Sequence, residues 1–415
     1  MSTPNVQYTE QASPIDRGPA FLRLALAVSA AGVVNIGLWI VVLILPNIQS
    51  DFGIERGSAS LAYSAAMAGF ALGNLVLGRF VDRYGISPIM VVCGLLLAAC
   101  YIASSYAPNI LVFSVLQFPI GFATATGFAP LIADVSHWFQ RYRGIAIATT
   151  ACGNYLAGTI WPLILKDIIA TDGWRPALLI VAVACIVVLL PMSFLLRRKI
   201  SSHGDSASAY SRPTKKTSIS DPVLVALLAL AGIGCCMAMA MPQIHIVAYA
   251  VDLGLGAETG AEMLSVMLAA GVISRLICGF LADRIGGVAT LLISSVLQYL
   301  ALCLYVPFDG PTELYTVSLI FGLAQGGIVP SYAIIVREYL PPEVAGRRIG
   351  LIVLATVAGM AIGGWAAGFI HDLTGSYAVA FLHGIAWNLL NIGVMMFILF
   401  RSRPARQVAA PSMAA

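Results

Sequence analysis

Twelve long apolar runs follow one another along this chain, each close to the ~20 residues that a helix needs to cross a bilayer. Inside a membrane every backbone N–H and C=O must be paired within the protein, so uninterrupted apolar runs of this length are helices. Charged residues make up only 10% of the chain, too few for a soluble domain. The sequence therefore predicts an all-α membrane protein, with spans at 20–46, 58–79, 88–106, 110–133, 144–166, 176–197, 222–250, 262–282, 288–307, 313–336, 348–371 and 377–400.

The positions of Lys and Arg predict how these spans are oriented. If both termini lie on the same side, nineteen of the 23 basic residues fall on that side. Three lie on the opposite side (Arg56, Lys166 and Arg175), and Arg275 falls within a span. Basic residues are enriched in cytoplasmic loops, so both termini are expected in the cytoplasm. The predicted location is the cytoplasmic (inner) membrane, crossed many times.

A polar, Ser-, Pro- and Lys-rich stretch at residues 198–221 divides the chain into two groups of six spans. We therefore expect a tail at 1–19, a six-helix half at 20–197, a cytoplasmic linker at 198–221, a second half at 222–400 and a tail at 401–415. The halves also resemble each other, because GRFVDRYGIS from Gly78 returns as GFLADRIGGV from Gly279, 201 residues later. Repeats of this kind are typical of transporters whose substrate site lies between the two halves.

The repeated pattern G-x-x-x-D-R-x-G follows the second span of each half. Its glycines are expected to allow a tight turn and close approach of helices, and its charged pair could form a latch between conformations. The pattern resembles the cytoplasmic loop signature of the major facilitator superfamily. That resemblance implies two pseudo-symmetric six-helix halves and transport by alternating access. The motif residues are Gly78, Asp82, Arg83 and Gly85, then Gly279, Asp283, Arg284 and Gly286.

Arg275 is the strongest candidate for a functional residue. It precedes Asp283 by eight residues, which places it about 12 Å deeper, near the bilayer centre. Gly271 and Gly279, one turn away on either side, would leave room beside it. A guanidinium there can bind a carboxylate through two parallel hydrogen bonds. The alternative is a structural arginine bonded to backbone carbonyl groups or to a buried acid, although no acid is expected at that depth.

Two further stretches resemble the monocarboxylate transporters and the related oxalate–formate antiporters: PQIHIVAYAVDLGL from Pro242 and HWFQRYRGIAIA from His137. In that branch an arginine at the position of Arg275 binds the substrate carboxylate. The chain departs from the pattern at two places. Gly271 replaces an aspartate of the animal transporters, and Thr356 aligns with a lysine of the oxalate–formate type. A single buried cation suggests a monoanion as substrate.

Other polar residues within spans are weaker candidates for the substrate path. His245 could line the cavity, titrate near neutral pH or only pack. The superfamily resemblance implies that spans 1, 4, 7 and 10 line the cavity, while hydrogen bonding between helices is the alternative role. The further candidates on these spans are Asn35, Gln117, Gln325 and Tyr332.

The predicted function is secondary transport of a small organic anion, with a proton as a candidate co-substrate. Two alternatives remain open: an efflux transporter for drugs or amphipathic metabolites, and a membrane receptor or sensor that does not transport. No nucleotide-binding loop or catalytic constellation is visible, so neither ATP use nor an enzyme is expected. The eight cysteines lack metal-ligand spacing. We expect a monomer without cofactor, metal or nucleic-acid partner.

Overall fold

The computed structural model describes residues 15–197 and 215–404, which are almost entirely helical. Pro and Ser/Asn side chains begin several helices; the side chains of Asn109 and Ser376, for example, accept hydrogen bonds from the first turns of the helices that follow them. The first half contains α1 Gly18–Val34, α2 Ile36–Phe52, α3 Arg56–Tyr84, α4 Ile86–Ser105, α5 Ile110–Thr124, η1 Ala125–Gly127, α6 Ala129–Ser136, α7 Arg143–Ala151, α8 Gly153–Thr171, α9 Trp174–Ala184, η2 Cys185–Leu189 and α10 Leu190–Leu195.

The second half begins with a short strand and continues with long helices. In chain order its elements are β1 Lys215–Thr217, α11 Asp221–Asp252, α12 Ala257–Ile285, α13 Gly287–Leu304, α14 Pro311–Gln325, α15 Ile328–Tyr339, α16 Pro342–Thr374, α17 Tyr377–Arg401 and β2 Ser402–Pro404.

Eleven helical segments among the described residues are long and apolar enough to cross a membrane. They correspond to eleven of the twelve predicted spans. The remaining prediction, 144–166, forms the helix pair α7 and α8, which meet at Cys152. Lys166 and Asp167 near the end of α8 make this segment less apolar than the others. The predicted fold class, an all-α membrane protein with two six-span halves, is confirmed.

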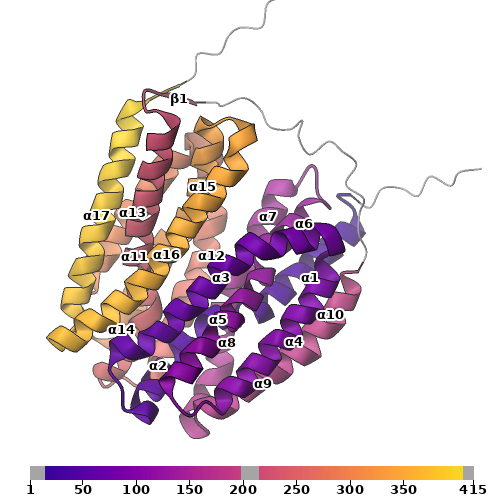
Figure 1. Cartoon of the computed structure of the whole chain (residues 1–415). Coiled ribbons are helices and arrows are strands. Elements are labelled where there is room, and N and C mark those ends of the chain that lie inside the picture. Colours follow the sequence, from indigo (N-terminus) through magenta and orange to yellow (C-terminus); the bar gives the residue numbers. More distant parts are fainter. Residues whose placement is uncertain (1–14, 198–214, 405–415) are drawn as a thin grey trace, which may run out of the picture.

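The two halves contact each other mainly at one end of the molecule. Helix α3 packs against α16, α8 against α12, and α2 against α11. Figure 1 shows the two groups of helices converging near the start of α14 and diverging toward β1. We call the end that carries β1, β2 and the start of α1 the linker end, and the other the far end. Hydrogen bonds and ion pairs that join the halves through Arg56, Gly57, Ser64, Lys166 and Arg275 lie between Arg275 and the far end.

One helix in each half is broken at an equivalent place. The fourth predicted span is interrupted by η1 and by Phe128, whose backbone leaves the helical region. The tenth is interrupted at Gly326 and Gly327, between α14 and α15. Ala125 and Gly326 are 201 positions apart, the spacing of the repeated loop motif. The internal repeat therefore extends into the interior of the bundle.

The loop motif forms the tight turns that its sequence predicts. Gly85 and Gly286 lie between consecutive helices with φ of 90° and 88°, a region that favours glycine. The expected close approach at the first glycine of each motif is wrong, because a Cβ atom on Gly78 or Gly279 would meet no heavy atom within 4 Å. The charged residues of both copies, Asp82, Arg83, Asp283 and Arg284, are exposed.

Strands β1 and β2 form a small antiparallel sheet in which Lys216 pairs with Arg403. From the sequence, these residues are expected in the polar linker and the C-terminal tail. Here the end of the linker region joins the segment after α17. Lys215 Nζ adds a 3.0 Å contact to Glu338 Oε2 at the end of α15. Most of the predicted tails and linker, at 1–14, 198–214 and 405–415, lie outside the described residues.

Candidate functional site

Arg275 lies on α12 with its side chain buried between the two halves. Its Nε donates to the main-chain oxygen of Gly326 at 3.2 Å, and its Nη1 donates to that of Ala151 at 2.6 Å. Both acceptors lie at helix ends, where carbonyl groups lack a partner in their own helix. The guanidinium carbon also lies 4.1 Å from the ring centre of Tyr155 on α8. Arg275 thus joins the breaks in two helices, one from each half.

The room expected beside Arg275 is only partly there. A Cβ atom on Gly271 would lie 2.9 Å from the ring of Tyr155, so that ring fills the space on this side. Only the space beside Gly279 is open. The missing side chain at Gly271 therefore lets an aromatic ring pack under the guanidinium, in a cation–π arrangement that favours a positive charge.

Two other arginines are buried to the same degree, and their partners differ from those of Arg275. Arg23 on α1 donates to both carboxylate oxygens of Asp134 at 2.8 Å. Arg56 at the start of α3 makes a two-pronged contact with Asp252. No carboxylate of the described chain forms an ion pair with Arg275. Its two carbonyl partners satisfy N–H donors but leave the positive charge without a counter-charge.

His245 lies apart from Arg275, in the outer part of α11. Its Nε2 is 2.8 Å from the main-chain oxygen of Gly364, and its Nδ1 is 2.9 Å from the hydroxyl of Tyr377. A carbonyl oxygen only accepts, so Nε2 carries the hydrogen and Nδ1 accepts from the tyrosine. Both ring nitrogens are therefore occupied by protein groups, and neither is presented to a substrate in this conformation.

The remaining predicted residues are fully buried and bonded to protein groups. Asn35 Nδ2 donates to Gly127 at 3.1 Å, at the break of its own half. Gln117 bonds within α5, Gln325 accepts from Gln243 at 2.6 Å, and Tyr332 donates to Asn391 at 3.1 Å. Gln325 precedes Gly326, which places it beside the Arg275 contact along the chain. The amide nitrogen of Gln325 and one oxygen each of Asn35 and Gln117 lack a partner among the described residues.

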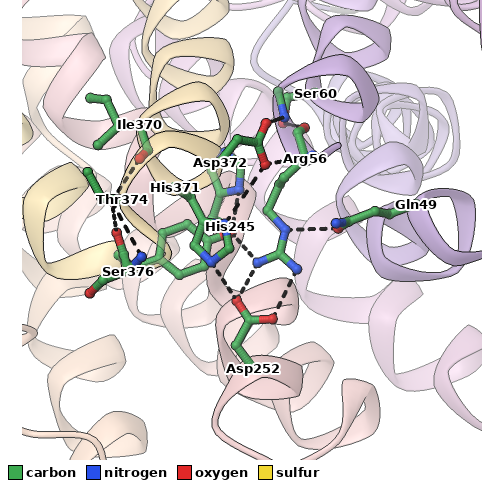
Figure 2. Close-up of polar contacts among 12 residues, drawn as sticks. Gln49, Arg56, Ser60, His245, Asp252, Ile370, His371, Asp372, Thr374 and Ser376 are labelled. Carbon is green, nitrogen blue, oxygen red and sulfur yellow. Dashed lines mark hydrogen bonds and ion pairs between the residues drawn. The ribbon is translucent and has the colours of Figure 1, made fainter. Parts of the chain in front are cut away.

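A second polar cluster at the far end was not foreseen. Figure 2 shows Gln49 and Arg56 from the first half meeting Asp252, His371 and other residues of the second half. Arg56 Nε donates to Gln49 Oε1 at 2.9 Å, and Nη1 donates to the Tyr377 hydroxyl at 3.0 Å. We call Arg56, Asp252, His371, Asp372 and Tyr377 the far-end cluster.

Asp372 ties the cluster to the beginning of α3. Its carboxylate accepts the backbone N–H of Arg56 at 2.9 Å and that of Gly57 at 2.6 Å. These N–H groups have no partner within α3, and a negative charge is favourable at a helix N-terminus. A helix of one half is therefore capped by a side chain of the other half. A second tie, between Lys166 and Glu262, joins α8 to α12 at the same end.

Metal ligation is not supported by the part of the chain that the structure describes, since no three His, Cys, Asp or Glu side chains lie close enough together to hold an ion. The described cysteines are free, and all but Cys303 are buried.

Known proteins that resemble this chain include transporters from animals, fungi and bacteria. Human monocarboxylate transporter 11 is 27% identical over 418 residues, covering 95% of this chain and 86% of its own. An agnestins efflux protein of Paecilomyces divaricatus is 24% identical over 323 residues, covering 75% and 72%. The resemblance to monocarboxylate transporters expected from the sequence is confirmed.

A solved structure and a family model agree on the fold. A bacterial homologue of the human lysosomal transporter Spinster, solved in an inward-facing and occupied conformation, has a TM-score of 0.71 at 13% identity. The comparison covers 91% of this chain and 96% of that one. The family model of the major facilitator superfamily matches residues 27–312 and 226–414. With its repeated halves, paired loop motifs and equivalent helix breaks, the chain belongs to the major facilitator superfamily.

Proposed function

We propose that this protein transports a small organic monoanion across the cytoplasmic membrane and that Arg275 binds its carboxylate. The observation that carries the proposal is the contrast among three buried arginines: Arg23 and Arg56 each face an aspartate, and Arg275 faces none. A buried charge without a counter-charge is costly, and a bound anion would remove that cost.

The geometry of Arg275 suits a carboxylate that exchanges with a carbonyl group. A guanidinium has five N–H donors, and the two carbonyl contacts use those on Nε and Nη1. A carboxylate could take Nη1 from Ala151 and add Nη2, which gives the two-pronged contact of an arginine–carboxylate pair. Thr356, where the oxalate–formate antiporters carry a lysine, bonds to Val353 and adds no charge. One cation supports one carboxylate on the substrate.

The arrangement of the halves supports alternating access. The described ion pairs and hydrogen bonds between them run from the far end to Arg275, at the middle of the molecule. Rocking the halves about this middle region would close the linker end and open the far end. The distribution of Lys and Arg supports a cytoplasmic location for the linker end, and therefore for both termini.

Proton symport is part of the proposal, but not through His245. Both nitrogens of that ring are bonded, one to the Gly364 carbonyl group and one to Tyr377. A second proton on the ring would have to displace the hydrogen bond from the tyrosine. The proton would instead travel on the carboxyl group of the substrate or on another group of the protein.

The test is flux into proteoliposomes with a panel of labelled monocarboxylates. We expect saturable uptake by the native protein, loss of uptake in Arg275→Gln, and little uptake in Arg275→Lys, because an ammonium lacks the planar fork. Arg337→Gln, which removes an exposed arginine from α15, is the matched control and should transport normally. Full activity of both Arg275 variants, with normal folding by size exclusion, would exclude Arg275 as the carboxylate ligand.

Efflux of amphipathic compounds is the second candidate function, favoured by the similarity to the fungal efflux protein. It predicts transport of cationic or neutral compounds that survives Arg275→Gln. The same vesicles, loaded with an amphipathic cation, separate the two functions. The third alternative, a receptor without transport, predicts saturable binding of a monocarboxylate with no flux in either direction.

A further inference from the structure

The far-end cluster is divided unequally between the halves. Its one arginine, Arg56, comes from the first half, on α3. Its two carboxylates and its histidine all belong to the second half, with Asp252 on α11 and His371 and Asp372 on α16. When the halves separate at this end, Arg56 leaves, and the histidine stays with both acids. The cluster is thus a contact between a mobile cation and a fixed group of anions.

His371 has one ring nitrogen that no hydrogen bond occupies. Its Nε2 lies 3.2 Å from a carboxylate oxygen of Asp252, which only accepts, so Nε2 carries a hydrogen. Its Nδ1 is buried and has no hydrogen-bond partner among the described residues. That nitrogen lies 4.0 Å from Oδ1 of Asp372. A buried acceptor nitrogen beside a carboxylate is a place where a proton can bind and be stabilised by charge.

The other groups around this ring are not free to take that role. Tyr377 on α17 lies against the ring, with centroids 4.5 Å apart, and its hydroxyl accepts from Arg56. His245 on α11 is bonded at both nitrogens. The neighbouring side chain from α2, that of Gln49, is uncharged. Asp252 accepts from the Arg56 guanidinium, and Asp372 accepts from the first N–H groups of α3. His371 is therefore the group of the cluster that has a protonation site not occupied by a hydrogen bond.

We propose that Nδ1 of His371 binds a proton in competition with Arg56 for Asp252 and Asp372, so that protonation opens the far end. Once protonated, the ring is a second cation between the same two carboxylates. When the far end closes, the Arg56 guanidinium and the N-terminus of α3, which carries a partial positive charge, approach the ring of His371, and water is excluded from it. Each of these opposes a second positive charge on the ring.

The direction of the pH dependence follows from linkage. The closed far end binds the proton on His371 less readily than the open far end does. The closed conformation is therefore stable at higher pH and loses stability as the pH falls. In a transporter, acidity on the far side would favour the conformation open to that side. This inference concerns the gate alone and does not depend on Arg275 or on the identity of the substrate.

The experiment measures the separation of the halves at the far end as a function of pH. Spin labels are attached at Thr171→Cys, at the end of α8, and at Thr312→Cys, in the first turn of α14; both positions are exposed. Double electron–electron resonance then measures the distance between the two labels. The labelled native chain without the added cysteines measures the background from the eight native thiols. We expect the long-distance population to grow several-fold between pH 8 and pH 5.5.

The decisive variant is His371→Gln, whose amide can still donate to Asp252 but cannot take up a proton. It should remain closed across the whole pH range. His383→Gln, which changes a half-buried histidine of α17 bonded to Trp387, should open on acidification as the native protein does. The proposal is wrong if the native protein shows no pH-dependent opening or closes on acidification. It is also wrong if His371→Gln responds to pH like the native protein, or if His383→Gln loses the response.

Discussion

Asn74 and Arg275 occupy equivalent positions in the two halves, 201 residues apart, and each bonds to the break in a helix of its own half. In the first half, Asn74 Oδ1 accepts from the backbone N–H of Ala129, just after the break between α5 and α6. In the second half, Arg275 Nε donates to Gly326 O at the break between α14 and α15. The position is shared, but only the second half places a charge there.

The difference between Asn74 and Arg275 shows which part of the side chain at this position the fold requires. A neutral amide is sufficient to satisfy a main-chain group at a helix break, as Asn74 does. Replacing an amide by a guanidinium adds the desolvation of a charge, and the surrounding protein provides no carboxylate for it. The charge of Arg275 is therefore not explained by a hydrogen bond at the break, which an amide can also make. The anionic substrate proposed above would explain it.

The largest effect is expected when the two positions are made alike. Arg275→Asn keeps a donor near Gly326 but removes the charge, so flux of the monoanion should fall on the order of 1,000-fold, about 4 kcal/mol of lost stabilisation. The measurement is initial uptake into proteoliposomes, normalised to folded protein. Uptake within about threefold of native would mean that an amide can replace the guanidinium at position 275 and that the charge has no role in transport.

A smaller effect, on stability and not on flux, is expected at Arg23, a buried arginine that is paired with an aspartate. Arg23→Gln leaves Asp134 partly buried without its partner and should lower the stability by about 2–3 kcal/mol. The observable is a lower midpoint of thermal unfolding in detergent. Transport per folded molecule should stay near native, whereas a loss of transport without a loss of stability would contradict a structural role for this pair.

The smallest effect is expected at the neutral member of the comparison. Asn74→Ala removes one hydrogen bond to Ala129 and one within α3, with an expected cost of about 0.5–1.5 kcal/mol. Uptake of the monoanion should remain within about twofold of native. A loss of uptake as large as that of Arg275→Asn would show that the break itself, and not the charge beside it, is required.

Much of the fold could be predicted because it depends on local sequence. Apolar runs specify helices in a membrane wherever they occur, and a positive φ before α4 and α13 requires a residue such as Gly85 or Gly286. The repeat spacing then relates the halves without any structure. The burial of Arg275 is consistent with its predicted place well inside a span. Its lack of an acid partner also followed, because few acids lie within the spans.

The far-end cluster could not be predicted because it depends on which helices meet. Arg56 and Asp252 are 196 residues apart, and each looks like an ordinary charge at the end of a span. Their pairing follows from the packing of α3 against α16, which itself packs against α11. The sequence could not choose among the roles of His245 for the same reason: its partners, Gly364 and Tyr377, come from α16 and α17. The sequence of α11 alone gives no sign that both nitrogens of the His245 ring are hydrogen-bonded.

The contact from Arg275 to Ala151 joins the two halves through an N–H group that the proposed cargo would also need. A carboxylate that takes this donor displaces the carbonyl oxygen, so the arrival of cargo and the release of this link become one event. Without substrate this hydrogen bond persists, and the empty transporter is held in its present conformation. Conformational exchange without bound substrate would then be opposed by Arg275, the same residue that is proposed to bind the substrate.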